Sequence, residues 1–206
     1  MPRPNPSQPD AIPGATIAAL RTGDESAWHA VLTRYQTPLF TYAQELLHHE
    51  TAALDLVQDT FIAAHRHLTS LRDEARFGSW LFGIAHQKII QHWRRAGREE
   101  PLDAEALAAT PDDLAPDPRD GTLRSEQAAA LFALVDELPP LQRAVLLLHF
   151  IEDFPLETIA EITAAPLGTV KSRLFHARRA LRERLSAPVP IHSADPAAAL
   201  GRTRPA

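Results

Sequence analysis

The chain has 206 residues, 45% of them hydrophobic, which is enough for one or two small domains with apolar cores. It contains no cysteine, which excludes disulfides and thiolate zinc sites, and no apolar run approaches the ~20 residues of a membrane-spanning helix, so we expect no membrane insertion. The formal net charge is −5, which argues against tight DNA binding by the free chain, because nonspecific DNA affinity derives from the neutralisation of phosphates.

The first part of the chain predicts a flexible arm, residues 1–14, and a helical domain, residues 15–96. The arm is rich in proline and lacks the apolar centre of a signal peptide. Asp24 is expected to cap a first helix, Pro38 to separate it from a second helix, and Thr51 to cap a third. Strict alternation of apolar and polar residues is absent, so we expect an all-α fold.

The third of these helices is expected to have two different faces. Its core face consists of Leu54, Val57, Phe61, Ala64 and Leu68. Its acidic and polar face, with one apolar residue, consists of Asp55, Gln58, Asp59 and Ile62. Such a face is suited to docking on a basic partner, although an ordinary solvated surface has the same composition.

A polar loop, residues 69–76, leads into a helix that begins at Phe77 and contains two tryptophans. We expect Trp80 in the core because it neighbours apolar residues, and Trp93 either in the core or against DNA or the linker.

An acidic linker, residues 97–124, separates the two helical parts. It has eight acidic residues against three basic ones, and its prolines interrupt any helix, although a plain solvated spacer has the same composition. After it we expect a second helical domain, residues 125–186, and a disordered tail, residues 187–206.

Residues 156–185 predict two short amphipathic helices with a break between them. The second helix is expected to start near Pro166 and to bury Val170, Leu174, Ala177 and Leu181. Its opposite side holds Ser172, Phe175, His176 and Arg179, with Lys171, Arg173 and Arg178 at the edges. Polar and aromatic side chains edged by cations are typical of a helix in the major groove, and a phosphate suits the free N–H groups and the Thr169 hydroxyl at its start. A surface helix with solvated arginines is the alternative.

Two parts of the sequence resemble extracytoplasmic-function sigma factors of the sigma-70 family, which direct bacterial RNA polymerase to particular promoters. Residues 138–183, LPPLQRAVLLLHFIEDFPLETIAEITAAPLGTVKSRLFHARRALRE, are similar to region 4, the promoter-binding domain of that family. Residues 53–68, ALDLVQDTFIAAHRHL, and 77–95, FGSWLFGIAHQKIIQHWRR, are similar to two helices of region 2. The resemblance implies two helical domains that bind polymerase and promoter DNA.

In region 4 of the family, the helix after the turn reads the minus-thirty-five promoter element. The resemblance assigns this contact to Thr169, Lys171, Ser172, Arg173, Phe175, His176, Arg178 and Arg179. His176 stands where arginine is usual, which weakens contact with phosphate or guanine.

In region 2 of the family, a loop and the polar face of the next helix capture unstacked bases of the minus-ten element. The resemblance assigns this contact to Arg72, Arg76, His86, Gln87, Lys88, Gln91, Arg94 and Arg95. A pocket for the base edge recovers part of the free energy that unstacking costs. The sequence departs from the family at His86, Gln87 and Gln91, so the preferred base stays open, although glutamine can pair with adenine.

Protein partners also follow from the resemblance. The contact with the clamp of the polymerase largest subunit is assigned to Asp55, Gln58, Asp59 and Ile62. The flap contact is assigned to Leu141, Leu148 and Phe150, of which Leu148 suits the core equally well. The resemblance further implies a linker that threads the polymerase cleft, a dedicated anti-sigma factor wedged between the domains, and a cytoplasmic location.

Two other functions fit parts of the sequence. A metal hydrolase would use some of the ten histidines, but His48 and His49 have no carboxylate at the spacing of helical zinc motifs. Neither a GxxxxGK phosphate loop nor a Gly-x-Ser-x-Gly motif occurs. A free-standing helix-turn-helix regulator explains residues 138–185 equally well but leaves residues 53–95 unexplained. We therefore expect a sigma factor without cofactor, metal site or catalytic activity.

Overall fold

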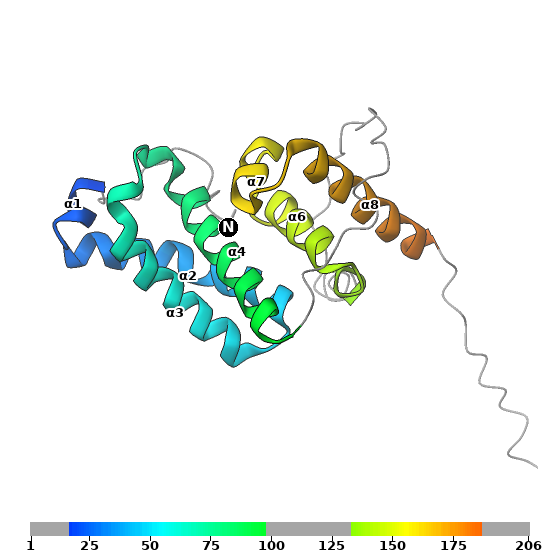
Figure 1. Ribbon diagram of the computed structural model, residues 1–206, viewed down its shortest axis with the longest axis horizontal. Helices are drawn as coiled ribbons and strands as arrows, with labels where there is room; N and C mark the ends of the chain where they lie inside the picture. Colours follow the sequence, from blue (N-terminus) through cyan, green and yellow to red (C-terminus); the bar gives the residue numbers. More distant parts are fainter. Residues whose placement is uncertain (1–16, 98–132, 187–206) are drawn as a thin grey trace, which may run out of the picture.

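The computed structural model describes residues 17–97 and 133–186, which are helical apart from their connecting turns (Figure 1). The first domain contains α1 (Ile17–Arg21), α2 (Glu25–Leu47), α3 (Glu50–His67) and α4 (Phe77–Arg95), with 3-10 turns at Leu68–Ser70 and Glu74–Arg76. The second contains α6 (Pro140–Phe150), α7 (Leu156–Thr163) and α8 (Leu167–Ser186). The predicted all-α fold with two helical domains is confirmed.

Several predicted segments lie outside the described residues: the arm, the tail, the linker beyond Gly97, and the first eight positions of the second domain. Within the two described ranges, no helix is long and apolar enough to cross a membrane.

α2 runs through Pro38 as one helix, so the predicted break at this residue is wrong. Proline has no N–H to donate to the carbonyl of Arg34, but packing holds the helix on both sides of it. One continuous face of α2 is buried, and it includes Val31, Tyr35, Leu39, Tyr42 and Leu46. The predicted cap is confirmed, because the Asp24 carboxylate accepts the N–H of Ala27 at 3.0 Å.

Two histidines form the junction between α2 and α3. His48 has a φ of +52°, and its N–H donates to the carbonyl of Gln44 at 2.9 Å, which ends α2. His49 Nδ1 accepts the N–H of Ala52 at 3.1 Å and caps α3. The predicted Thr51 cap is wrong because the His49 ring supplies the acceptor two residues earlier.

The core face of α3 consists of Ala53, Leu56, Val57, Thr60, Phe61 and Ala64. This set follows helical spacing from Ala53, and Leu54 lies about 100° from Ala53, at the edge of the buried face. Leu54 is 49% exposed, and its predicted place in the core is wrong.

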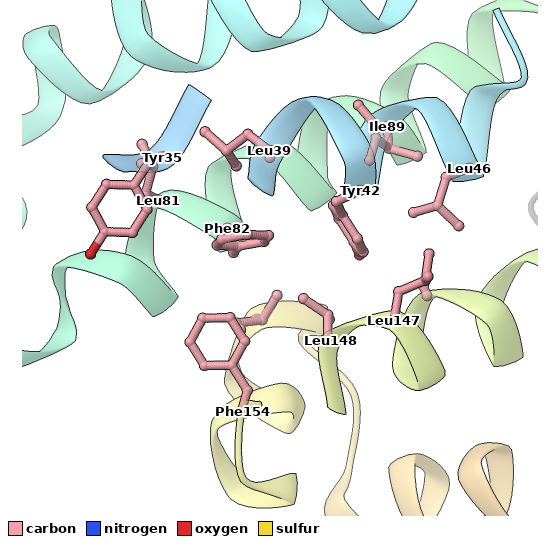
Figure 2. Close-up of a cluster of buried hydrophobic side chains, with 14 of the residues drawn as sticks. Tyr35, Leu39, Tyr42, Leu46, Leu81, Phe82, Ile89, Leu147, Leu148 and Phe154 are labelled. Atoms are coloured by element: carbon pink, nitrogen blue, oxygen red, sulfur yellow. The ribbon is translucent and has the colours of Figure 1, made fainter. Parts of the chain in front are cut away.

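The two domains share one apolar core, and α6 lies inside it. Every residue from Leu141 to Leu148 is buried, because α6 packs against α2 on one side and against α7 and α8 on the other. Figure 2 shows the shared cluster, in which side chains of α2 and α4 face those of α6 and of the α6–α7 connection. The rings of Phe82 and Phe154 meet edge to face, with their centroids 5.3 Å apart. The ring centroids of Tyr42 and Phe82 are 5.6 Å apart.

Arg143 adds a buried polar link between the domains. Its guanidinium donates to the carbonyl of Glu45 at 2.7 Å and contacts the His48 ring, both at the end of α2. In its own domain it donates to the carbonyls of Asp136 and Leu138. A buried guanidinium needs such acceptors because removing its charge from water is costly.

Tyr42 and His86 form a polar pair inside the same core. The Tyr42 hydroxyl and His86 Nδ1 share a hydrogen bond of 2.8 Å, and neither residue is more than 3% exposed. Burial, and then the positive charge of Arg173 on α8, lowers the pKa of His86 from its ordinary value of 6.5 to about 4. Burial also raises the pKa of Tyr42. His86 is therefore neutral at pH 7.

We expect Phe154→Ala to lower the free energy of unfolding by about 3 kcal/mol or more, because it removes a fully buried ring from the shared core. Urea unfolding followed by circular dichroism measures the change. Phe150→Ala is the matched control, since Phe150 is 41% exposed and should cost less than about 1 kcal/mol. Equal losses in the two variants would contradict the shared core.

The neutral state of His86 predicts a loss of stability in acid. Above pH 6.5 this imidazole is uncharged in both states, whereas between pH 6.5 and about 4 only the unfolded chain takes up the proton. His86 should therefore remove about 2 kcal/mol from the free energy of unfolding between pH 7 and pH 5. Urea titrations of His86→Asn should show this acid-dependent loss reduced by that amount, whereas His67→Asn, at an exposed position, should keep it. An unchanged pH dependence in His86→Asn would refute the assignment.

Candidate nucleic-acid interface

A cavity of about 600 Å³ lies between the loop before α4, the α4 helix and α7. Five of the eight residues predicted for the minus-ten contact line it: Arg72, Arg76, Gln87, Lys88 and Gln91. The remaining lining residues are Ser70, Leu71, Asp73, Ser79, Trp80, Gly83, Ile84, Glu161 and Ile162. The structure thus brings the predicted loop and the predicted helix face together around one space.

Helical spacing explains the α4 wall of the cavity. Gln87, Lys88 and Gln91 follow Trp80 at i+7, i+8 and i+11, so all four residues share one face. Trp80 was expected in the core, but it is half-buried, stands 5.8 Å from the ring of Phe77 and lines the cavity. The spacing between Trp80 and the two glutamines is the signal that places it here.

The other three residues predicted for the minus-ten contact lie elsewhere. His86 is 3% exposed and bonded to Tyr42, so its predicted exposure to DNA is wrong in this arrangement, because α2 and the second domain cover it. Arg94 and Arg95 are exposed in the last turn of α4 but do not line the cavity. Trp93, 2% exposed, belongs to the core.

The second domain supplies one wall of the cavity. The Glu161 carboxylate on α7 lies 2.9 Å from the Arg76 guanidinium. The Asp59 carboxylate on α3 lies 3.9 Å from the ammonium of Lys88. Exposed pairs of this kind stabilise a fold only slightly. They matter here because two cations predicted to hold phosphates are paired with carboxylates of the chain itself.

The turn between α7 and α8 is built on Ala164, which has a φ of +51° and donates its N–H to carbonyls in the last turn of α7. α8 begins at Leu167, one residue after Pro166. Its predicted buried stripe is confirmed at Val170, Leu174 and Ala177, each 0% exposed, and Leu181 is half-buried.

The outer side of α8 is less open than predicted. Arg179 is exposed and lies 3.4 Å from the Glu183 carboxylate. The half-buried members of the predicted set are Thr169, Lys171, Arg173, Phe175, His176 and Arg178. Ser172 is 1% exposed, so its predicted outward position is wrong.

The polar face of α3 is open to solvent. Its four predicted members, Asp55, Gln58, Asp59 and Ile62, are all exposed. Leu54 lies on the same side and adds a second exposed apolar residue, which the sequence interpretation missed by assigning it to the core. Of the three residues predicted for the flap contact, Phe150 is 41% exposed, whereas Leu141 and Leu148 are buried in α6, and Leu148 takes the core position that suited it equally well.

No group of three or more histidine, aspartate or glutamate side chains within the two described ranges is arranged to hold a metal ion. His48 and His49 instead serve as the end of α2 and the cap of α3.

Comparisons with known proteins agree on one family. Residues 31–99 match the family model of sigma-70 region 2, and residues 128–181 match that of sigma-70 region 4. The chain is 29% identical to the RNA polymerase sigma-H factor of Pseudomonas aeruginosa over 177 residues, which covers 82% of this chain and 91% of the relative. It is 28% identical to the ECF RNA polymerase sigma factor SigW of Bacillus subtilis over 176 residues, covering 82% and 94%.

Solved structures share the fold. CnrH, in complex with the cytosolic domain of CnrY, matches with a TM-score of 0.59 and 25% identity, covering 84% of this chain and 96% of CnrH. The sigma factor RpoE from Bartonella quintana, in complex with the anti-sigma factor NepR, matches with a TM-score of 0.59 and 26% identity, covering 79% and 98%. Both domains are thus matched in sequence and in fold, and the chain belongs to the extracytoplasmic-function sigma factors of the sigma-70 family.

Proposed function

We propose that this chain is a promoter-recognition subunit of RNA polymerase that captures the melted minus-ten element with its first domain and reads the minus-thirty-five element with its second. The observation that carries the proposal is the cavity beside α4, where cationic, amide and aromatic side chains surround about 600 Å³. This volume is typical of pockets for small ligands, so an unstacked nucleobase fits.

The cavity residues divide into three roles. Trp80 provides a surface on which an extruded base stacks, which recovers part of the free energy of unstacking. Gln87 and Gln91 carry amides that donate to and accept from a base edge. Arg72, Arg76 and Lys88 hold the phosphates on either side, together with Arg94 and Arg95 farther along α4.

In the second domain, α8 is the element that enters the major groove. Lys171, Arg173, Arg178 and Arg179 contact the phosphates, while Phe175 and His176 are the candidates for base contacts. Thr169 and the free N–H groups of the first turn of α8 hold a further phosphate.

Both DNA-binding faces are partly occupied in the arrangement described here. Glu161 pairs with Arg76, Ser172 is buried, and the charge of Arg173 acts on His86 of the other domain. We infer that this is the arrangement of the chain without polymerase, and that the domains separate when it joins the enzyme. Together with the net charge of −5, it leads us to expect poor binding of promoter duplex by the free chain.

The exposed face of α3 docks on the clamp of the polymerase largest subunit, and Phe150 contributes to the flap contact. Acidic residues around two exposed apolar side chains match a basic surface with an apolar centre. The chain catalyses no reaction and needs no cofactor or metal. It acts in the cytoplasm, where the polymerase is, and an anti-sigma factor holds it inactive.

Reconstituted transcription tests the proposal. Purified chain should co-purify with core RNA polymerase and support run-off transcripts from a promoter mapped after forced expression. The free chain should bind the same duplex at least tenfold more weakly, because both DNA-binding faces are partly occupied and its net charge is negative. Sequence-specific binding to a palindromic duplex without polymerase, and no transcript with it, would identify a free-standing regulator instead.

The α3 docking face can be tested separately. We expect Ile62→Asp to lower the affinity for core polymerase about tenfold, because it places a charge in the apolar centre of the contact. Competition binding with labelled wild-type chain measures the affinity. Leu32→Asp on α2 is the matched control, since Leu32 is 37% exposed and Ile62 41%. The docking assignment fails if both substitutions have the same effect.

A further inference from the structure

The short helix α1 (Ile17–Arg21) precedes the part of the chain that matches sigma-70 region 2, which begins at residue 31. It nevertheless lies against the loop that forms one wall of the cavity beside α4. Two hydrogen bonds cross from α1 to this loop. They join residues 50 and 57 positions apart in the sequence.

The first bond runs from the guanidinium of Arg21 to the main-chain carbonyl of Leu71, at 2.8 Å. The second runs from the N–H of Ile17 to the carboxylate of Glu74, at 3.2 Å. The two acceptors lie on either side of Arg72 and Asp73, which line the cavity. α1 therefore holds the loop on both sides of Arg72 and Asp73.

α1 is itself fixed to the body of the first domain. Ile17 is 6% exposed and Leu20 2%, and the indole N–H of Trp28 on α2 donates to the carbonyl of Leu20 at 3.1 Å. Gly23, at a φ of +77°, turns the chain directly into the Asp24 cap of α2. A support anchored in this way can transmit rigidity to the loop that it contacts.

The loop's own hydrogen bonds are local. The N–H of Leu71 donates to Leu68, and the N–H groups of Ala75 and Arg76 donate to Asp73, so each 3-10 turn is closed within itself. These bonds hold each turn but do not join one turn to the other. The bonds from α1 connect the turns to a common support.

We propose that α1 is a brace for the minus-ten pocket and that Arg21 is a positioning residue, which sets base discrimination by holding the main chain at Leu71. The inference rests on the proposed function of the cavity. Arg21 is exposed, so removing its side chain should change the shape of the pocket wall more than the stability of the fold.

The experiment compares wild type, Arg21→Ala, Arg21→Lys and Arg66→Ala, each as the full chain bound to core polymerase. Fluorescent single-stranded minus-ten oligonucleotides, with each base changed in turn, measure the ratio of affinities for preferred and changed bases. Hydrogen exchange of loop residues 70–76 in the free chain is the second measurement. Arg66→Ala is the control, because Arg66 is an exposed arginine on α3 outside the cavity lining.

We expect Arg21→Ala to lower discrimination at one or two bases by about tenfold, which is the effect of misplacing one base-reading contact. Loop exchange should become faster, and affinity for core polymerase should change less than about twofold. Arg21→Lys should recover part of the discrimination, because an ammonium can also donate to the carbonyl. Arg66→Ala should match wild type in all measurements.

The outcomes separate the brace from the function on which it rests. Wild-type discrimination and unchanged loop exchange in Arg21→Ala would overturn the brace. Absence of base discrimination by the wild-type holoenzyme would overturn the proposed function of the cavity. In that case the exchange measurement alone decides whether α1 holds the loop.

Discussion

The edge-to-face contact of Phe82 with Phe154 joins the two domains into one apolar core, and the main features of the structure depend on this junction. It places α6 inside the molecule, closes one side of the cavity beside α4 with α7, and encloses the Tyr42–His86 pair. Across the junction, Arg143 pairs with the end of α2. The apolar rings supply most of the stabilisation, whereas the guanidinium restricts how the domains fit together, because its acceptors lie in both of them.

The sequence predicted those features that depend on neighbours along the chain. The buried stripe of α8 at Val170, Leu174 and Ala177 follows from helical spacing, and the Asp24 cap follows from its side-chain acceptor. Two predictions for the first domain, the break at Pro38 and the Thr51 cap, were wrong for local reasons. At Pro38 packing on both sides outweighs the missing N–H, and at the start of α3 a histidine ring replaces the more usual hydroxyl cap.

In the candidate site, too, the sequence predicted the features that depend on spacing within one helix. Spacing places Gln87, Lys88 and Gln91 on one helix face, and the same rule applied to Trp80 finds the aromatic wall of the cavity. No pattern within one helix reveals that a second domain will cover part of that helix. His86 follows Phe82 at i+4 and precedes Ile89 at i+3, so spacing places it on the buried side of α4, but no such pattern reveals that Tyr42 of α2 bonds it there. The contact of α1 with Leu71 and Glu74 was unpredictable for the same reason, because it joins segments at least 50 positions apart.

The burial of α6 on all sides has a consequence for how the domains come apart. Leu147, Leu148 and Phe154 are covered by the first domain and would meet water after separation, at about 25 cal/mol for each Å² of apolar surface uncovered. Such a surface left bare would favour self-association. Release of the second domain is therefore favourable only where another macromolecule covers these side chains at the same time. Their apolar contacts with the first domain are then replaced by apolar contacts with that partner, and the side chains are not left in water.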